Sequence, residues 1–152
     1  MAVVKIVGYD YTDYQSVSRL INYCIDKKKS QGNYCFYNLY PQIAPIEILN
    51  VARFFGDDDF EWNTKVLHII ISFSHSDMVS TSMACSIGHE IAGYFMQRYQ
   101  VLFAVHNNTD NIHLHMIVAM YSFIDGKPVS MSENYKTQFR RFVDTIIDNY
   151  SG

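Results

Sequence analysis

Every second residue of the segment 112–121 is a large apolar residue, and the residues between them include two histidines. Successive side chains of a β-strand point to opposite faces of its sheet, so this pattern predicts a strand with two different faces. The apolar face is formed by Ile112, Leu114, Met116, Val118 and Met120. The opposite face carries His113 and His115, and we expect it to lie open while the apolar face is buried under helices.

A third histidine is expected beside these two. The core side of the preceding segment 101–106 is formed by Val101, Phe103 and Val105. His106 therefore lies on the other side of that strand. The polar turn 107–111 is short, so the two strands run antiparallel, and their pairing brings His106 next to His113 and His115.

Three imidazoles from neighbouring strands can bind one divalent metal ion and leave coordination positions open for a substrate. Asp110, in the turn between the strands, is placed to orient one of these histidines. A histidine taken alone is most often an exposed surface residue. Three of them on one predicted face favour a metal site over that alternative.

The other histidines are interpreted differently. His68 shares a strand face with Ser72 and borders the predicted site under one interpretation. His75 lies near a strand end and His89 lies within a predicted helix, and we interpret both as structural.

The remaining elements follow from periodicity, caps and turn residues. Strands are predicted at 2–7 and 66–74, an extended segment at 34–40 and a hairpin turn at 125–127. Helices are predicted at 13–26, at 45–55, from Ser80 or Thr81 through Phe95, and at 134–150. Helices between the strands would cover one face of the sheet. We therefore predict an α+β fold of ferredoxin-like character, an antiparallel sheet with helices on one face.

Composition limits the class of protein. A chain of 152 residues, 49% of them hydrophobic, fits one folded domain. No segment resembles a secretory signal or a membrane span, and the cysteines are three in number, without a close pair, so a reducing cytoplasm is expected. The net charge of −3 argues mildly against a nucleic-acid partner, but acidic residues gather at 57–61, apart from the basic runs 27–29 and 140–141.

The stretch 103–118 resembles the third motif of the mobilisation relaxases, His-x-Asp-x-Asp-x-x-His-x-His followed by apolar residues. On this resemblance His106, His113 and His115 are the metal ligands. Asn108 stands where the family commonly has Asp, and Ala119 where it often has Asn.

Two further stretches carry the resemblance, which covers most of the chain. The segments 67–77 and 88–92 are similar to the family's sequence ahead of the histidine motif. The segment 21–29 resembles the first motif, whose tyrosine attacks DNA, and that tyrosine would be Tyr23.

The resemblance implies a fold and an activity. The fold would be the palm of the HUH endonuclease type, forming a single nuclease domain over 1–152 that many relaxases continue into a longer C-terminal region. The activity would be site- and strand-specific nicking and rejoining of DNA at a transfer origin during conjugative mobilisation of a plasmid. Mn²⁺ or Mg²⁺ would be the cofactor, and single-stranded DNA and accessory mobilisation proteins the partners.

Helical spacing gives Tyr23 a basic setting. Arg19, Tyr23 and Lys27 form an i, i+4, i+8 stripe beside the apolar face of the predicted helix. Together with Lys28 and Lys29, the two cations of this stripe are the expected DNA-binding residues. The nearest competing tyrosines are Tyr9, Tyr11 and Tyr14.

Three other functions fit the same histidines. A single-tyrosine transposase of the same superfamily would use a tyrosine in the C-terminal helix, where Tyr135 and Tyr150 are available. An inactive or metal-stabilised DNA-binding module would fit the negative net charge. A phosphodiesterase or RNA nuclease would use water activated by the metal and would form no covalent adduct.

Overall fold

The computed structural model describes residues 2–7, 10–56 and 63–151. Tyr9 and the acidic residues at 57–61 lie outside this part of the chain. Its strands are β1 (Val3–Val7), β2 (Tyr34–Tyr37), β3 (Val66–Ser72), β4 (Val101–His106) and β5 (His113–Ala119). Its α-helices are α1 (Tyr14–Ile25), α2 (Lys27–Ser30), α3 (Ala44–Phe55), α4 (Thr81–Ala92) and α5 (Glu133–Ser151). Short 3-10 helices are η1 (Pro41–Ile43) and η2 (His75–Asp77).

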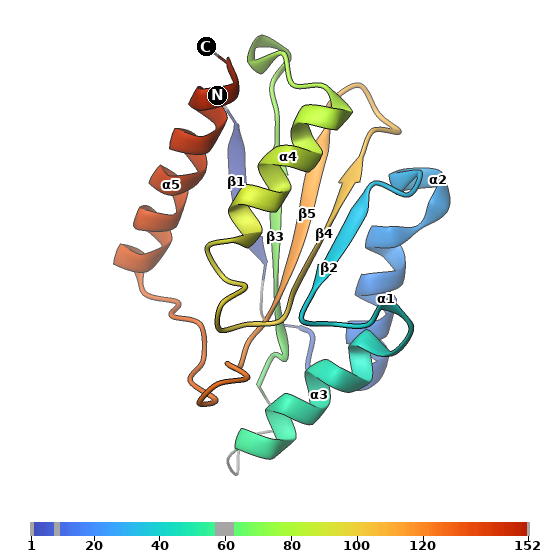
Figure 1. Ribbon diagram of the computed structural model, residues 1–152, viewed down its shortest axis with the longest axis vertical. Coiled ribbons are helices and arrows are strands. Elements are labelled where there is room, and N and C mark those ends of the chain that lie inside the picture. The colour runs from blue at the N-terminus through green and yellow to red at the C-terminus, as the bar shows by residue number, and fades with distance from the viewer. Residues whose placement is uncertain (1, 8–9, 57–62, 152) are drawn as a thin grey trace.

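The strands form one five-stranded sheet in the order β1-β3-β5-β4-β2, and every neighbouring pair is antiparallel (Figure 1). The predicted α+β class with an antiparallel sheet is therefore confirmed. The strands β4 and β5 are joined by the turn 107–112, and their register pairs His106 directly with His113. None of the described helices has the length and apolarity that crossing a bilayer would require.

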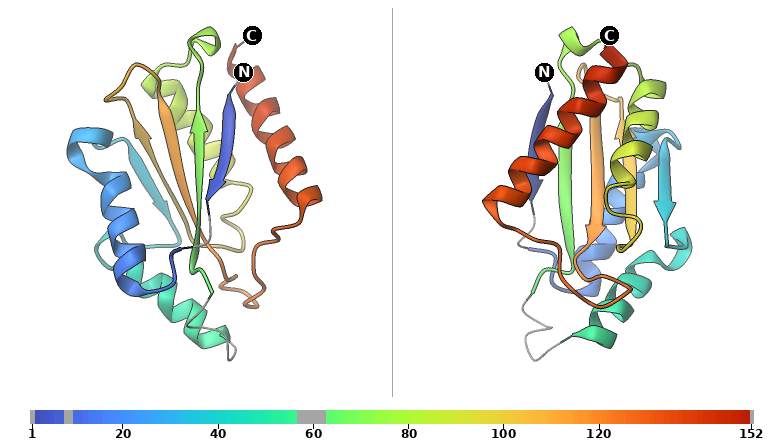
Figure 2. Two further views of the ribbon diagram at one scale, coloured as in Figure 1. Left: turned by 180° about the vertical axis from the view of Figure 1, so that it is seen from behind. Right: turned by 60° about the vertical axis from the view of Figure 1, so that its left-hand side comes forward.

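Helices cover both faces of the sheet, and the expectation of helices on one face was wrong in this respect (Figure 2). One core lies between the sheet and α4 and α5, where Phe103 and Leu114 are buried. A second core lies between the opposite face and α1 and α3, where Leu102 and Ile117 are buried. The physical reason is visible in β4, whose residues are all buried, because a strand that is apolar at successive positions is covered on both sides.

Helix α1 begins and ends at aspartates. Asp13 caps its start, with the side chain accepting a hydrogen bond from the Ser16 backbone N–H at 2.8 Å and the Ser16 hydroxyl bonded back to the Asp13 backbone. Asp26 has a non-helical backbone (φ −49°, ψ 130°) and caps the separate helix α2 by accepting from the Lys28 and Lys29 N–H groups. The chain therefore leaves the line of α1 before Lys27.

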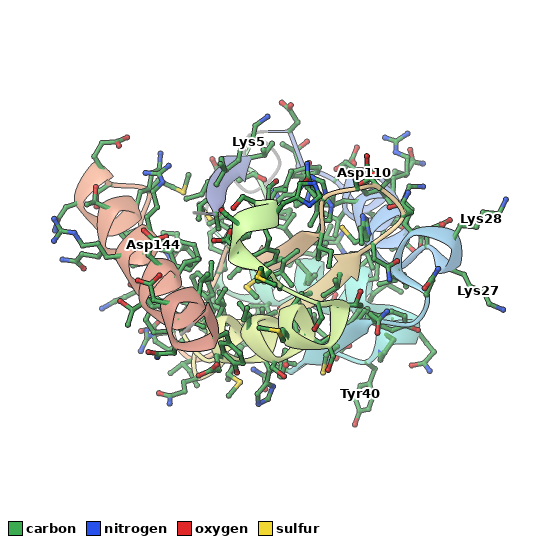
Figure 3. All side chains as sticks on the ribbon, turned by 90° about the horizontal axis from the view of Figure 1, so that it is seen from above. Lys5, Lys27, Lys28, Tyr40, Asp110 and Asp144 are labelled. Carbon is green, nitrogen blue, oxygen red and sulfur yellow. The ribbon has the colours of Figure 1, made fainter. Side chains whose placement is uncertain are left out.

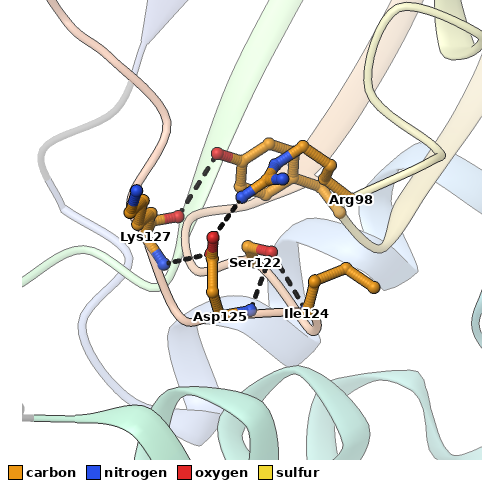
Figure 4. A network of polar contacts seen from close by, with 6 residues as sticks. Arg98, Ser122, Ile124, Asp125 and Lys127 are labelled. Carbon is orange, nitrogen blue, oxygen red and sulfur yellow. Dashed lines mark hydrogen bonds and ion pairs between the residues drawn. The ribbon is translucent and has the colours of Figure 1, made fainter.

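The end of the sheet away from the histidines is fixed by the loop after β5 (Figure 4). Arg98 forms an ion pair with Asp125 at 2.5 Å, and the Asp125 carboxylate also accepts a hydrogen bond from the Lys127 backbone N–H. Gly126 takes a left-handed backbone (φ 74°), and a Cβ there would lie 2.3 Å from Phe55. This bears out the predicted turn at 125–127 and explains why it requires glycine.

Candidate active site

Histidines cluster on the sheet face that α1 covers. His113 lies between Ser72 of β3 and His106 of β4 in one cross-strand row, and His115 lies between Ile70 and Ala104 in the next row. The rings of His106 and His115 approach to 4.2 Å between centroids, and those of His113 and His115 to 6.4 Å. The pairing of these three histidines on one face, predicted from strand alternation, is therefore observed.

This face is less open than expected. His106 is 4% exposed and His115 is 6% exposed, because α1 packs over both, while His113 is half-buried at the end of the hairpin. The site is a semi-enclosed cluster at the edge of the α1 core, with His113 as its more accessible member.

The Nε2 nitrogen of His106 is hydrogen-bonded to the backbone of α1. Its Nε2 lies 2.7 Å from the Cys24 carbonyl oxygen, which can only accept a hydrogen bond, so Nε2 carries the ring proton. In the neutral ring the lone pair then resides on Nδ1. A histidine whose second nitrogen donates to a carbonyl is the usual form of a metal ligand.

Burial favours the neutral, ligating form of the clustered rings. Burial is the main cause that lowers the pKa of His115 to about 3, and positive charge on the neighbouring histidines is the smaller cause. Removal from water and the charge of His106 lower the pKa of His68 to about 4, and the pKa of His106 is also lowered, mainly by burial. Near pH 7 these rings are uncharged and can accept a cation.

The donor set fits a divalent ion. Imidazole nitrogens suit first-row transition ions better than Mg²⁺, which prefers oxygen ligands. The His106 and His115 imidazoles are each held by a hydrogen bond on one nitrogen, which orients two of the three predicted ligands. Whether these three histidines hold the ion stays a prediction.

A second group of metal-ligand side chains overlaps with this one. Donor atoms of Cys24, His68 and His115 all lie within 4.8 Å of one another. Burial raises the pKa of the Cys24 thiol to about 12, so the thiol is protonated near neutral pH and is a poor ligand in that form. These residues are therefore a rival ligand set that shares His115 with the predicted one.

Tyr23 lies over the histidine cluster. Its ring packs edge-on against His106 and His115, with centroid distances of 5.6 Å and 5.8 Å. The side chain is 46% exposed, so a substrate can reach it. The tyrosine indicated by the resemblance is thus brought to the histidines by the fold.

The basic residues around Tyr23 are not arranged as the helical stripe predicted. Because α1 ends at Ile25, Lys27 does not continue the stripe of Arg19 and Tyr23. Lys27 and Lys28 point away from the sheet in a view from above (Figure 3). Lys29 instead lies over the Tyr23 ring, with its Nζ 5.0 Å from the centroid.

One further cation shares the histidine face. Lys5 of β1 pairs with Ile70, which pairs in turn with His115, so the exposed Lys5 lies in the same cross-strand row as that histidine. The sequence indicated that β1 is a strand but not which strand it neighbours. The roles of Arg19, Lys27, Lys28 and Lys29 in binding DNA remain predictions.

Asp110, which was expected to orient a histidine, lies at a hollow beside His75. Asp110 is exposed in the turn after β4 and lines a hollow of about 140 Å³ with His75 and Asn111. Within the described residues, Nε2 of His106 is instead bonded to the Cys24 carbonyl, and Nδ1 of His115 is bonded to Nε2 of His68. The orienting role of Asp110 stays a prediction.

Of the competing tyrosines, those of α5 lie on the other side of the sheet. Tyr135 and Tyr150 pack against the core that α4 and α5 form, whereas the histidines face α1. Burial raises the pKa of Tyr135 to about 12. Near the histidines, Tyr11 contacts His68, while Tyr14 is exposed at the start of α1.

Comparison with known proteins assigns a family to this arrangement. The family model described as "Relaxase: MobA/VirD2-like, nuclease domain" matches residues 23–151, so the match begins at the tyrosine that lies over the histidines. No functionally curated protein shows significant similarity to the chain.

Proposed function

Because the chain belongs to the relaxase family with a MobA/VirD2-like nuclease domain, whose members nick DNA, we propose that it nicks and rejoins one strand at a transfer origin through Tyr23. The single observation that carries this proposal is the packing of the Tyr23 ring against His106 and His115. This packing supports a reaction in which Tyr23 and the predicted ligands act on the same phosphate.

The reaction is a transesterification. The Tyr23 oxygen attacks the scissile phosphorus, and the downstream DNA fragment becomes linked to Tyr23 through its 5′-phosphate. The P–O3′ bond breaks, and the departing oxygen takes up a proton to give a free 3′-hydroxyl. Because one phosphodiester replaces another, a 3′-hydroxyl can reverse the step without a nucleotide cofactor.

His106, His113 and His115 would hold the ion. When bound, a divalent ion such as Mn²⁺ supplies charge stabilisation at the scissile phosphate. The His106 and His115 imidazoles contribute by being neutral and oriented, as their lowered pKa values and their hydrogen bonds to Cys24 and His68 indicate.

Tyr23 itself needs activation, because a phenol is mostly un-ionised at neutral pH. Lys29, whose ammonium lies 5.0 Å from the centre of the Tyr23 ring, would supply a positive charge near the developing phenolate. Lys5, in the row of His115, adds a positive charge on the histidine face of the sheet. Single-stranded DNA would lie across this face, between the α1–α2 region and β1.

The setting in which we place this activity is conjugative mobilisation of a plasmid, in the cytoplasm and with accessory mobilisation proteins. All three cysteines are free, as a reducing compartment requires. A transposase would attack DNA through Tyr135 or Tyr150. This attack is disfavoured within one chain, because both tyrosines lie on the opposite side of the sheet from the histidines.

A cleavage assay tests the proposal. Single-stranded oligonucleotides tiling the DNA around the gene are incubated with protein and Mn²⁺ or EDTA, and the products are separated on denaturing gels that retain protein–DNA adducts. We expect metal-dependent cleavage with protein attached to the 5′ end of one product. Cleavage without an adduct would favour a water-activating phosphodiesterase, and binding without cleavage an inactive module.

A further inference from the structure

A fourth histidine is bonded to the cluster from behind. His68 of β3 is 6% exposed, and its Nε2 lies 2.9 Å from Nδ1 of His115. On its other side, Nδ1 of His68 lies 3.4 Å from the Tyr11 hydroxyl. The three groups therefore form a chain of contacts that runs from the segment before α1 to the centre of the site.

The chemistry of this chain permits two proton arrangements. A hydrogen bond between two neutral imidazoles needs one donor and one acceptor. If His68 donates, the Nδ1 lone pair of His115 is consumed and its Nε2 carries the proton, so neither nitrogen can bind an ion. If His115 donates through Nδ1, its Nε2 lone pair is free, and the proton of His68 resides on Nδ1, facing Tyr11.

We propose that His68 is a positioning residue that holds His115 in the tautomer with a free Nε2, and that Tyr11 fixes the orientation of His68. This inference rests on the proposed function, in which His115 binds the ion. A metal-binding histidine normally donates its second N–H to an acceptor, and His68 is the acceptor that the structure offers to His115. It performs for His115 what the Cys24 carbonyl performs for His106.

The geometry favours this role over that of His68 as a ligand. Two nitrogens that bind one ion direct their lone pairs at the ion, whereas two nitrogens in a hydrogen bond face each other with a proton between them. The 2.9 Å separation of the His68 and His115 nitrogens is the distance of a hydrogen bond. Placing an ion between them would require the two strands' side chains to separate.

Two substitutions of His68 distinguish these roles. His68→Gln keeps an acceptor near the position of Nε2, whereas His68→Leu removes it with little change in bulk. Mn²⁺ affinity, measured by titration calorimetry, is expected to fall about 10- to 100-fold in His68→Leu and to be largely retained in His68→Gln. Tyr11→Phe is expected to give a smaller loss, and thermal unfolding checks that each variant is folded.

A readout without metal or DNA accompanies the affinities. In ¹⁵N-labelled metal-free protein, histidine NMR is expected to show the His115 proton on Nδ1 in the wild type and in His68→Gln, and displaced from it in His68→Leu. An unchanged tautomer and unchanged affinity in His68→Leu would overturn the proposal. Equal loss of Mn²⁺ in both variants would do so too, by making His68 a ligand. A wild type that binds no Mn²⁺ would instead refute the proposed function, while the tautomer result would still report on the His68–His115 bond.

Discussion

The ring of Tyr23 packs edge-on against the ring of His106, 5.6 Å between centroids, although 83 positions separate the two residues in the chain. The backbone carbonyl of the next residue, Cys24, bonds the same histidine. Helix α1 therefore supplies both the candidate nucleophile and a group that orients a candidate ligand. Any movement of α1 would therefore displace the candidate nucleophile and the orienting carbonyl together.

Replacing His113 tests the ligand set with little risk to the fold. His113 is half-buried, so His113→Ala is expected to lower Mn²⁺ affinity by roughly 100-fold or more while stability changes little. Titration calorimetry gives the affinity and urea unfolding gives the stability. His89→Ala is the matched control, because His89 lies on α4 and pairs with Tyr37 of β2, away from the cluster. Equal affinities for the two variants would remove His113 from the site.

Cys24 separates the two possible ligand sets. We expect Cys24→Ala to bind Mn²⁺ within about threefold of the wild type, because the variant keeps the backbone carbonyl that bonds His106. The raised pKa of the thiol, about 12, also predicts that thiolate stays scarce up to pH 9. Thiol reagents should then modify the exposed Cys35 and spare Cys24 until the protein unfolds. Loss of Mn²⁺ in Cys24→Ala would place the ion among Cys24, His68 and His115.

Lys29 and Lys28 differ in the structure although they are neighbours in the sequence. Lys29 lies over the Tyr23 ring and Lys28 points into solvent, so Lys29→Gln should slow adduct formation by roughly tenfold and Lys28→Gln by no more than about twofold. Single-turnover kinetics at fixed ionic strength measure the difference. Equal effects would mean that the two lysines contribute only general attraction to DNA.

Much of this arrangement was visible in the sequence, and the failures have particular causes. Strand alternation placed His113 and His115 on one face with His106, because a period of two depends only on local geometry. The position of Lys27 was wrong because a single residue, Asp26, leaves the helix in a segment whose composition otherwise suits a helix.

Other features depend on tertiary packing that one sequence leaves open. The contact of His68 with His115 needs β3 and β5 to be neighbours in register, and that pairing was not predicted. The covering of both faces did have a signal, because residues 101–105 are apolar at every position, including Leu102 and Ala104 on the histidine face. The clean alternation of 112–121 instead predicted a sheet with one buried face and one open face.

Gly88 sets how closely α4 approaches the hairpin that carries the histidines. A Cβ at this position would lie 2.8 Å from the Phe103 ring and 2.9 Å from a Leu114 methyl group, both in the core. Gly88→Ala is therefore expected to lower the free energy of unfolding by about 1–3 kcal/mol in urea titrations. The exposed Ser82→Ala on the same helix should change it by less than about 0.5 kcal/mol. A Gly88→Ala variant as stable as the wild type would show that this packing can relax.

The role of Tyr23 is tested most directly by identifying the amino acid that becomes linked to DNA. Wild-type protein is incubated with a cleavable single-stranded oligonucleotide and Mn²⁺, the adduct is digested, and the DNA-linked peptide is sequenced by mass spectrometry, with Tyr23→Phe run in parallel. We expect a peptide that carries the DNA on Tyr23 and no adduct in Tyr23→Phe, which should still fold and bind Mn²⁺. An adduct that persists in Tyr23→Phe, or one that maps to Tyr11, Tyr135 or Tyr150, would contradict this expectation.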